Sequence, residues 1–385
     1  MARKNPPYQG FEQGPIRPPS EARSLLIRIT RNCPWNRCTF CSIYKHAKFS
    51  IRPVVDVIKD IDTVYKHLQR IGELADDSGT VYRSGLSELA GRTDPDEMEA
   101  FQAALNWYVS GMESVFLQDA NSLVIKPDYL VEILSHLKNR FPWVSRITSY
   151  ARSHSLARIS DENLESIREA GLNRIHVGLE TGSDILLNLI QKGSSKETHI
   201  AAGRKVKKAG IELSEYVMPG LGGQKFSEIH ARETADALNQ INPDFIRLRT
   251  LTVPQNYQLY ASEEEYQFLR ASDYQIAEEI KLFIDSLQGI TSTLKSDHIM
   301  NLLQTVAGTF PEDKPAMLKT IQDYLDLPEE ERMLFQVGRR FGFLLRIEDL
   351  AKDHLNARVR EICDHLGITS TNVDEMIEKH ANRSI

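Results

Sequence analysis

Three of the chain's four cysteines lie close together, at Cys33, Cys38 and Cys41, and form the pattern C-x4-C-x2-C. The fourth cysteine, Cys363, lies more than three hundred residues downstream, so no nearby thiol completes a set of four. A 4Fe-4S cluster normally takes four thiolates, and a cluster held by three leaves one iron open to an exogenous ligand. The spacing therefore predicts an iron-sulfur centre that takes part in chemistry.

A structural zinc site is the alternative interpretation of the same cysteines. Closed zinc sites use four protein ligands, usually in two well-separated pairs, and the sequence contains no second pair. His46 is a candidate for a fourth ligand. We favour the cluster over zinc because the rest of the chain adds independent support.

The segment around the cysteines, R-N-C-P-W-N-R-C-T-F-C-S-I-Y, resembles the radical S-adenosylmethionine superfamily. The usual pattern of that family is C-x3-C-x2-C with an aromatic residue before the last cysteine, a place that Phe40 occupies here. The extra residue between Cys33 and Cys38 departs from the usual pattern. The resemblance implies one 4Fe-4S cluster, S-adenosylmethionine as cofactor, oxygen sensitivity, and an electron donor such as flavodoxin or ferredoxin.

Composition narrows the class of protein. The 385 residues are 41% hydrophobic and 26% charged, as in ordinary globular chains long enough for one large domain and a smaller one. No apolar run approaches the ~20 residues of a membrane-spanning helix, and the first residues lack the apolar core of a signal peptide. Because a cluster also needs reduced thiolates, we expect a cytoplasmic protein without a membrane span.

The charge balance argues against a nucleic-acid partner. The chain has 47 Lys and Arg residues against 53 Asp and Glu residues, a net charge of -6, and the basic residues are scattered. Nucleic-acid binding proteins usually carry a clustered basic surface. We therefore expect a small-molecule or lipid-like substrate and no nucleic acid.

Alternating β-type and helix-period segments predict an α/β fold. A β-rich run at 24–30 leads into the cysteine segment, and an amphipathic pattern follows at 54–71. Further β-type runs lie at 114–117, 144–149, 174–178, 213–218 and 245–251, with helical segments at 127–140, 161–170, 196–209 and 227–240. Six such units imply a parallel sheet with right-handed crossovers, and so a partial (β/α)6 barrel. The family resemblance implies the same fold.

Three regions are expected along the chain. Residues 1–23 are polar and proline-rich and predict an extended N-terminal arm. Residues 24–255 form the barrel, with an insertion at about 72–110 that includes a helix at 96–109. Residues 256–385 form a helical C-terminal region, with helices at 263–287, 298–307, 314–325 and 329–345 and a short strand near 290–294.

Chemistry in such barrels takes place at the carboxyl ends of the strands. The resemblance implies that Gln118, Asp119 and Asn121, after the second strand, accept hydrogen bonds from the cofactor's amino group. Asn121 also fits a helix cap before Pro127. After the third strand, Ser149 and Arg152 are implied as cofactor-binding residues.

The last three strand ends complete the predicted site. Glu180 follows the fourth strand and is implied as a ribose or amine ligand, although a solvated cap is the alternative. Met218 and Gly220 follow the fifth strand, where the resemblance implies an adenine site that glycines allow the backbone to approach closely. Arg249 in the sixth strand lies two residues after Arg247, and an interior arginine needs an anion. The alternative is that both arginines face solvent.

The function expected from this reasoning is that of a radical S-adenosylmethionine enzyme. An RNA-modifying or protein-modifying radical enzyme is the first alternative, and a binding protein that uses the metal as a structural clip is the second. Four apolar residues of the C-terminal region have two possible roles, to close the barrel mouth over a ligand or to pack helices together: Phe335, Phe341, Phe343 and Leu344.

Overall fold

The computed structural model describes residues 8–45, 47–76, 80–253, 259–260 and 266–381. These residues form an α/β fold whose main sheet has eight strands in the order β1-β4-β5-β6-β7-β8-β9-β10. Six of them are the predicted strands: β1 Leu25–Arg28, β4 Ser114–Gln118, β5 Arg146–Ala151, β6 Arg174–Glu180, β7 Glu212–Val217 and β8 Phe245–Leu248. The recorded pairings among these six are parallel, which confirms the partial barrel.

The predicted helices of the barrel are also present. They are α1 Val54–Gly72, α3 Met98–Val109, α4 Pro127–Arg140, α6 Asp161–Glu169, α8 Lys196–Lys208 and α9 Ser227–Ile241. In α1 the residues at helical spacing, Val57, Ile61, Val64 and Leu68, are all buried, so the apolar stripe that predicted the helix is its packing face. Short elements fill the connections: η1 Pro19–Glu21, β2 Thr30–Arg31, β3 Ser50–Ile51, η2 Pro95–Glu97, η3 Ser122–Val124, α5 Ser153–Leu156 and α7 Asp184–Leu189.

The chain divides into two compact units. Unit 1 comprises residues 1–36, 42–177 and 205–213, and unit 2 comprises residues 37–41, 178–204 and 214–385. The domain boundaries given above stay a prediction. The three predicted cysteine ligands are divided between the units: Cys33 belongs to unit 1, and Cys38 and Cys41 belong to unit 2.

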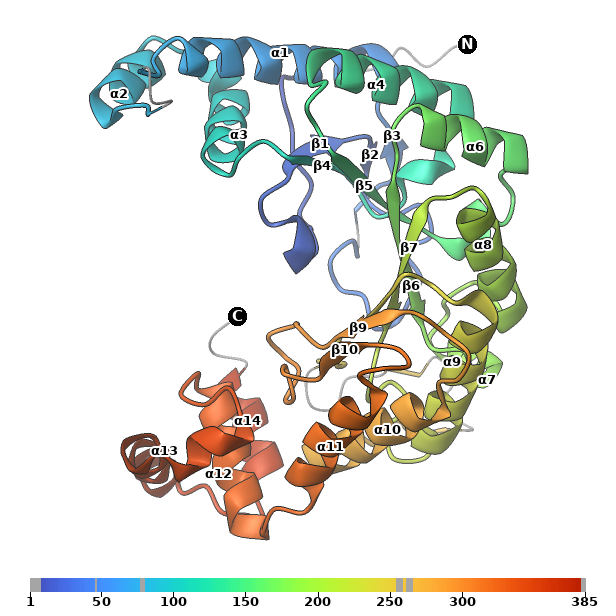
Figure 1. The fold of residues 1–385 in the computed structure, drawn as a ribbon, viewed down its shortest axis with the longest axis vertical. Coiled ribbons are helices and arrows are strands. Elements are labelled where there is room, and N and C mark those ends of the chain that lie inside the picture. The colour runs from blue at the N-terminus through green and yellow to red at the C-terminus, as the bar shows by residue number, and fades with distance from the viewer. Residues whose placement is uncertain (1–7, 46, 77–79, 254–258, 261–265, 382–385) are drawn as a thin grey trace. The chain divides into compact units, whose positions relative to one another are not determined.

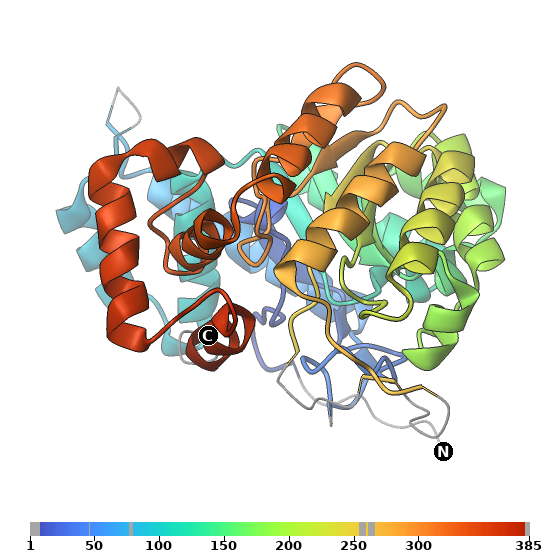
Figure 2. The same ribbon diagram turned by 90° about the horizontal axis from the view of Figure 1, so that it is seen from below.

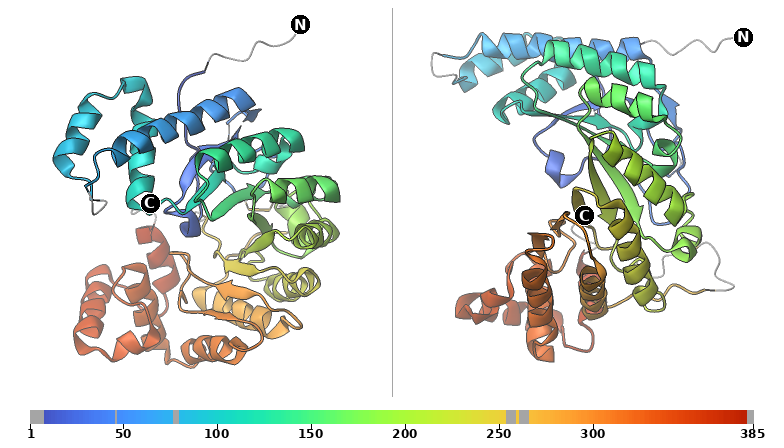
Figure 3. Two further views of the ribbon diagram at one scale, coloured as in Figure 1. Left: turned by 45° about the horizontal axis from the view of Figure 1, so that its top comes forward. Right: turned by 45° about the vertical axis from the view of Figure 1, so that its right-hand side comes forward.

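Unit 1 contains β1, β4 and β5 and the helices that cover them. Helix α1 packs against α3 and α4, and α4 packs against α6 (Figures 1 and 3). The insertion contains α3, as predicted, and also α2 Arg83–Gly91, which the sequence did not indicate. No residue of α2 is buried, so this helix has no apolar stripe from which to predict it.

Unit 2 extends the sheet beyond the six barrel strands, first with the short strand predicted near 290–294. β9 Thr293–Lys295 pairs parallel with β8, and β10 Ala307–Thr309 pairs antiparallel with β9. The helix predicted at 298–307 is wrong, because turns precede β10 there. The buried Asn301 side chain accepts a hydrogen bond from the backbone N–H of Thr250 at 2.8 Å and donates to the carbonyl of Leu248 at 2.8 Å. These bonds to the end of β8 hold a turn in place of the helix.

The C-terminal helices are α10 Asp273–Ser286, α11 Lys314–Leu325, α12 Glu329–Arg340, η4 Ile347–Ala351, α13 Asp353–Leu366 and α14 Val373–Ala381. The helix predicted from residue 263 begins at Asp273, where Ser272 forms a capping box, and residues 261–265 lie outside the described part of the chain. The helix predicted at 329–345 ends at Arg340, because Gly342 takes a φ of 78°. Helices α13 and α14 both pack against α12 (Figure 2).

The aromatic residues of this region pack the helices together. Phe335 and Leu344 are buried in the core of unit 2, and Phe341 and Phe343 pack against the same core. The packing alternative is therefore confirmed for these four residues. No helix among the described residues combines the length and apolar character needed to cross a bilayer.

Candidate active site

The first cysteine lies in a tight turn held by asparagines. Asn32 and Asn36 adopt positive φ values of 67° and 49°, a conformation that asparagine tolerates better than most residues. The backbone N–H of Asn36 points at the sulfur of Cys33, with a distance of 3.4 Å. The turn therefore presents a backbone donor to the first of the predicted metal ligands.

The other two cysteines lie in the short segment of unit 2. The backbone N–H of Thr39 donates to the carbonyl of Ile190 at 3.0 Å, and the N–H of Cys41 donates to the carbonyl of Cys38 at 3.3 Å. Phe40 packs against the apolar cluster that includes Met218. The aromatic residue of the motif therefore anchors this part of the segment.

The donor chemistry fits an iron-sulfur cluster. Cys33, Cys38 and Cys41 are partly exposed, whereas Cys363 is buried. Among the described residues, no three histidine, cysteine or acidic side chains lie close enough together to hold a metal ion. His46 lies outside those residues. The three-cysteine ligand set stays a prediction, supported by the thiols' accessibility and by the N–H group directed at Cys33.

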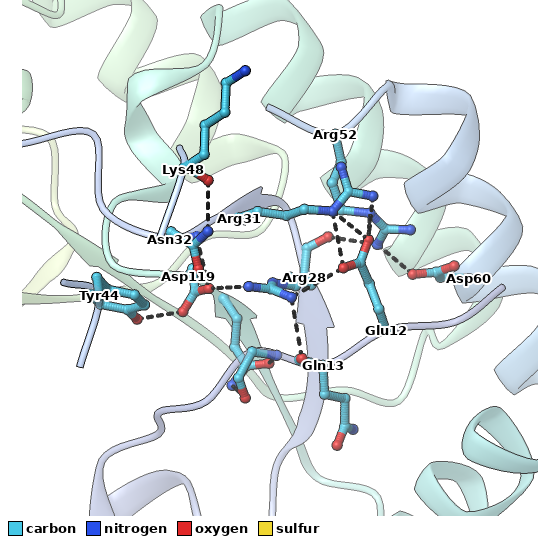
Figure 4. Close-up of polar contacts among 12 residues, drawn as sticks. Glu12, Gln13, Arg28, Arg31, Asn32, Tyr44, Lys48, Arg52, Asp60 and Asp119 are labelled. Carbon is cyan, nitrogen blue, oxygen red and sulfur yellow. Dashed lines mark hydrogen bonds and ion pairs between the residues drawn. The ribbon is translucent and has the colours of Figure 1, made fainter. Parts of the chain in front are cut away.

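The carboxylate of Asp119 is enclosed by unit 1 (Figure 4). It accepts hydrogen bonds from Arg28 Nη2 at 2.9 Å, from the backbone N–H of Asn32 at 3.1 Å and from the hydroxyl of Tyr44 at 2.5 Å. Its exposed fraction is 0%. At Gly14, a Cβ atom would come within 2.8 Å of Asp119 Oδ1, so the absence of a side chain lets the N-terminal arm cover the carboxylate.

Glu12 of the arm holds a group of arginines beside Asp119 (Figure 4). Its carboxylate lies 3.1 Å from Arg28, 2.6 Å from Arg31 and 2.8 Å from Arg52. Burial acts to raise the pKa of Glu12, but the hydrogen bond from Arg31 and the charges of the three arginines outweigh it and lower that pKa. Asp60 balances the charge of Arg52 at 2.5 Å. The arm is thus tied to the strand that leads into the cysteine segment.

Gln118 and Asn121, which were also predicted to bind the cofactor, form hydrogen bonds with other parts of the chain. The Gln118 amide accepts from the N–H of Gly14 at 2.8 Å and donates to the carbonyl of Ile16 at 2.7 Å. Asn121 donates to the hydroxyl of Ser155 at 2.8 Å. Gln118 therefore seats the arm, and Asn121 stabilises the turn after β5.

Arg152 contacts the cysteine segment. Its guanidinium lies 5.0 Å from the ring centroid of Trp35, and its backbone N–H donates to Asn121 Oδ1 at 3.1 Å. The buried Ser149 hydroxyl is directed at the carbonyls of Leu117 and Tyr150. The structure therefore brings Arg152, but not the Ser149 hydroxyl, to the cysteine segment of unit 1.

Glu180 forms an ion pair that sequence reasoning missed. Lys192 Nζ lies 2.9 Å from Glu180 Oε1 and 5.7 Å from the ring centroid of Phe40, so Lys192 connects the acid to the cysteine motif within unit 2. Burial raises the pKa of the neighbouring Glu215 well above its usual value, although the charge of Lys192 opposes the shift. Gly178 leaves space for the pair. No sequence pattern pointed to Lys192, because this residue lies twelve positions after Glu180 and α7 separates the two.

A buried network supports the glycine-rich turn after β7. Gly220, with a φ of 83°, donates its N–H to Glu279 at 2.7 Å, and Ser227 donates its hydroxyl to Glu279 at 2.6 Å. His230 lies 3.6 Å from Glu279, and its other ring nitrogen lies 2.8 Å from the hydroxyl of Thr181. Burial raises the pKa of Glu279 to about 7 and lowers the pKa of His230 to about 4. Burial thus favours the uncharged form of both side chains.

The two arginines near β8 differ in their surroundings. Arg247 is buried and lies 3.0 Å from Asp297, so the protein supplies its counter-ion. Arg249 lies just after the strand and is exposed. The exposure of Arg249 agrees with the solvent-facing alternative, and its role as an anion ligand stays a prediction.

The pKa shifts of Glu279 and His230 have opposite directions. They predict that the free energy of unfolding changes with pH in opposite directions when one or the other residue is replaced. The ionisation of Glu279 is disfavoured in the folded state, so its contribution to the free energy of unfolding falls as pH rises from about 4.5 to about 7. The contribution of His230 rises from about pH 4 to about pH 6.5. In the parent the two slopes offset one another.

We expect Glu279→Gln to leave a free energy of unfolding that rises with pH by up to ~1.4 kcal/mol per pH unit, and His230→Gln to leave one that falls. Urea unfolding between pH 4.5 and 6.5 measures both slopes. Slopes equal to that of the parent in both variants would contradict the shifts.

Comparison with known proteins identifies the family. Residues 27–234 match the Radical SAM superfamily. A tRNA-2-methylthio-N(6)-dimethylallyladenosine synthase from Hahella chejuensis is 24% identical over 242 residues, which are 62% of this chain and 45% of the relative. The chain thus spans less than half the length of that relative.

Two solved structures are similar at low sequence identity. The Escherichia coli coproporphyrinogen III oxidase HemN has a TM-score of 0.43 and 14% identity, over 68% of this chain and 51% of HemN. The Methanocaldococcus infernus Elp3 has a TM-score of 0.42 and 15% identity, over 61% of each chain. Because the family match covers more than half of the chain, this protein belongs to the Radical SAM superfamily and is a radical SAM enzyme.

Proposed function

We propose that Cys33, Cys38 and Cys41 hold one 4Fe-4S cluster with an open iron, and that the enzyme acts on a small-molecule or lipid-like substrate. The observation that carries the proposal is the set of three closely spaced, partly exposed cysteines inside the segment that matches the family. Such a cluster would pass one electron from a flavodoxin-like or ferredoxin-like donor to the sulfonium of S-adenosylmethionine, which would give methionine and a 5′-deoxyadenosyl radical able to abstract a substrate hydrogen.

The chain's own residues have positioning roles in this proposal. Phe40 fixes the later half of the cysteine segment against unit 2, and Gly220 offers a turn without a side chain for the adenine. Glu180 serves as the ribose or amine ligand, and its ion pair with Lys192 holds it in position. Arg249, exposed after β8, is the candidate partner of an anionic group.

A cavity in unit 2 supports a compact substrate. Its volume is about 310 Å³, at the lower end of the range for small-molecule sites. It lies beside the residues that follow β8 and has a mixed wall of apolar and charged side chains, including Leu251, Ile276, Arg270, Asp374 and Ile377. Such a wall suits a small ligand with an apolar body and a polar group.

We expect single replacement of Cys33, Cys38 or Cys41 by alanine to abolish cluster loading, because two thiolates are too few to hold the cluster. Cys363→Ala is the matched control. Its thiol is 4% exposed, and burial raises its pKa, so it behaves as a small apolar residue of the core. Iron and sulfide content after anaerobic reconstitution measures the outcome. Loss of iron from the Cys363 variant, or full loading of any of the other three, would contradict the assignment.

RNA modification is the second candidate function. The Hahella relative's name specifies a tRNA nucleoside product, and this relation favours an RNA substrate. The charge of the present chain favours the other candidate, because nucleic-acid binding draws on neutralisation of phosphates by Lys and Arg, and acidic residues are in excess here.

The two candidates differ in the salt dependence of RNA binding. We expect no retention of bulk tRNA by the protein in a filter-binding assay at physiological salt. If binding is seen at low salt, it should decline steeply as salt increases, as non-specific binding does. Tight binding at physiological salt would instead assign the enzyme to RNA modification.

A further inference from the structure

Asp119 connects the two ends of the segment that carries the cysteines. The backbone N–H of Asn32, immediately before Cys33, donates to Asp119 Oδ2 at 3.1 Å. The hydroxyl of Tyr44, three residues after Cys41, donates to Asp119 Oδ1 at 2.5 Å. One carboxylate therefore fastens both sides of residues 33–43 to the end of β4.

The surroundings leave this carboxylate no surface for a ligand. Its exposed fraction is 0%, and the third donor, Arg28, supplies the charge that a buried carboxylate needs. Gly14 covers it, and Gln118 holds Gly14 in place through two hydrogen bonds. The interactions of Asp119 are thus directed inward, to the loop and the arm.

We propose that Asp119 is a positioning residue that closes the cysteine loop, rather than the acceptor of the cofactor's amino group. Holding both ends of a loop together removes conformational freedom before the metal binds, so less entropy is lost on cluster assembly. The inference deepens the proposed function, because it concerns the loop that would hold the cluster. The two hydrogen bonds that close the loop are present without metal, so the metal-free protein is used to test their role.

The test uses Asp119→Asn, Tyr44→Phe and the double variant. Tyr82→Phe is the matched control, since its hydroxyl donates to Asp76 at 2.9 Å on the exposed surface of the same unit. Anaerobic alkylation of the metal-free protein, followed by mass spectrometry, measures the rate at each cysteine. Cys363 is an internal reporter of global unfolding because it is buried.

We expect Tyr44→Phe and Asp119→Asn each to speed alkylation of Cys33, Cys38 and Cys41 about tenfold, the effect of one lost charge-assisted hydrogen bond. The rate at Cys363 should stay unchanged. The double variant should show little beyond the larger single effect, because both changes open the same contact. Tyr82→Phe should match the parent at all four cysteines.

The opposite pattern would overturn the proposal. If Asp119 instead bound the cofactor's amino group, Asp119→Asn would weaken S-adenosylmethionine binding while both variants kept parental alkylation rates. If Asp119→Asn does not fold, Tyr44→Phe decides alone, and parental rates in that variant refute the closure. A parent protein that never takes up iron would refute the proposed function, while the alkylation result in the metal-free protein would still decide the role of Asp119.

Discussion

A buried carboxylate must be fully partnered, and unit 1 is arranged around this requirement at Asp119. Its three donors come from β1, from the residue before Cys33 and from Tyr44 after Cys41. The arm adds a second acid, Glu12, which binds Arg28, Arg31 and Arg52. Each of these contacts restrains the start of the cysteine segment, so the N-terminal arm is a structural part of the candidate active site.

Unit 2 restrains the later cysteines by different means. Apolar packing around Phe40 and the hydrogen bond from Thr39 to Ile190 hold residues 37–41, and Lys192 adds charge next to Phe40. The glycine turn after β7 depends on Glu279, whose burial is tolerated because Gly220 and Ser227 donate to it. Apolar packing and buried polar groups thus hold the later cysteines and the glycine turn in place within unit 2.

The sequence predicted the barrel because periodicity is a local signal. The six strands and their helices follow from alternating apolar patterns. The wrong helix at 298–307 had a tertiary cause, the hydrogen bonds of Asn301 to residues about fifty positions away. The enclosure of Asp119 and the pairing of Glu180 with Lys192 were missed for a similar reason, since their partners are set by the fold. Spacing predicted the cysteines as ligands, but it did not predict the contacts that hold them.

The central claim is that three thiolates leave one iron open to S-adenosylmethionine. The most direct measurement is the electron paramagnetic resonance spectrum of the reconstituted, reduced protein, recorded anaerobically before and after addition of S-adenosylmethionine. We expect about four irons per chain and a cluster signal that shifts when the cofactor binds. Zinc in place of iron, or a cluster signal that S-adenosylmethionine leaves unchanged, would contradict it.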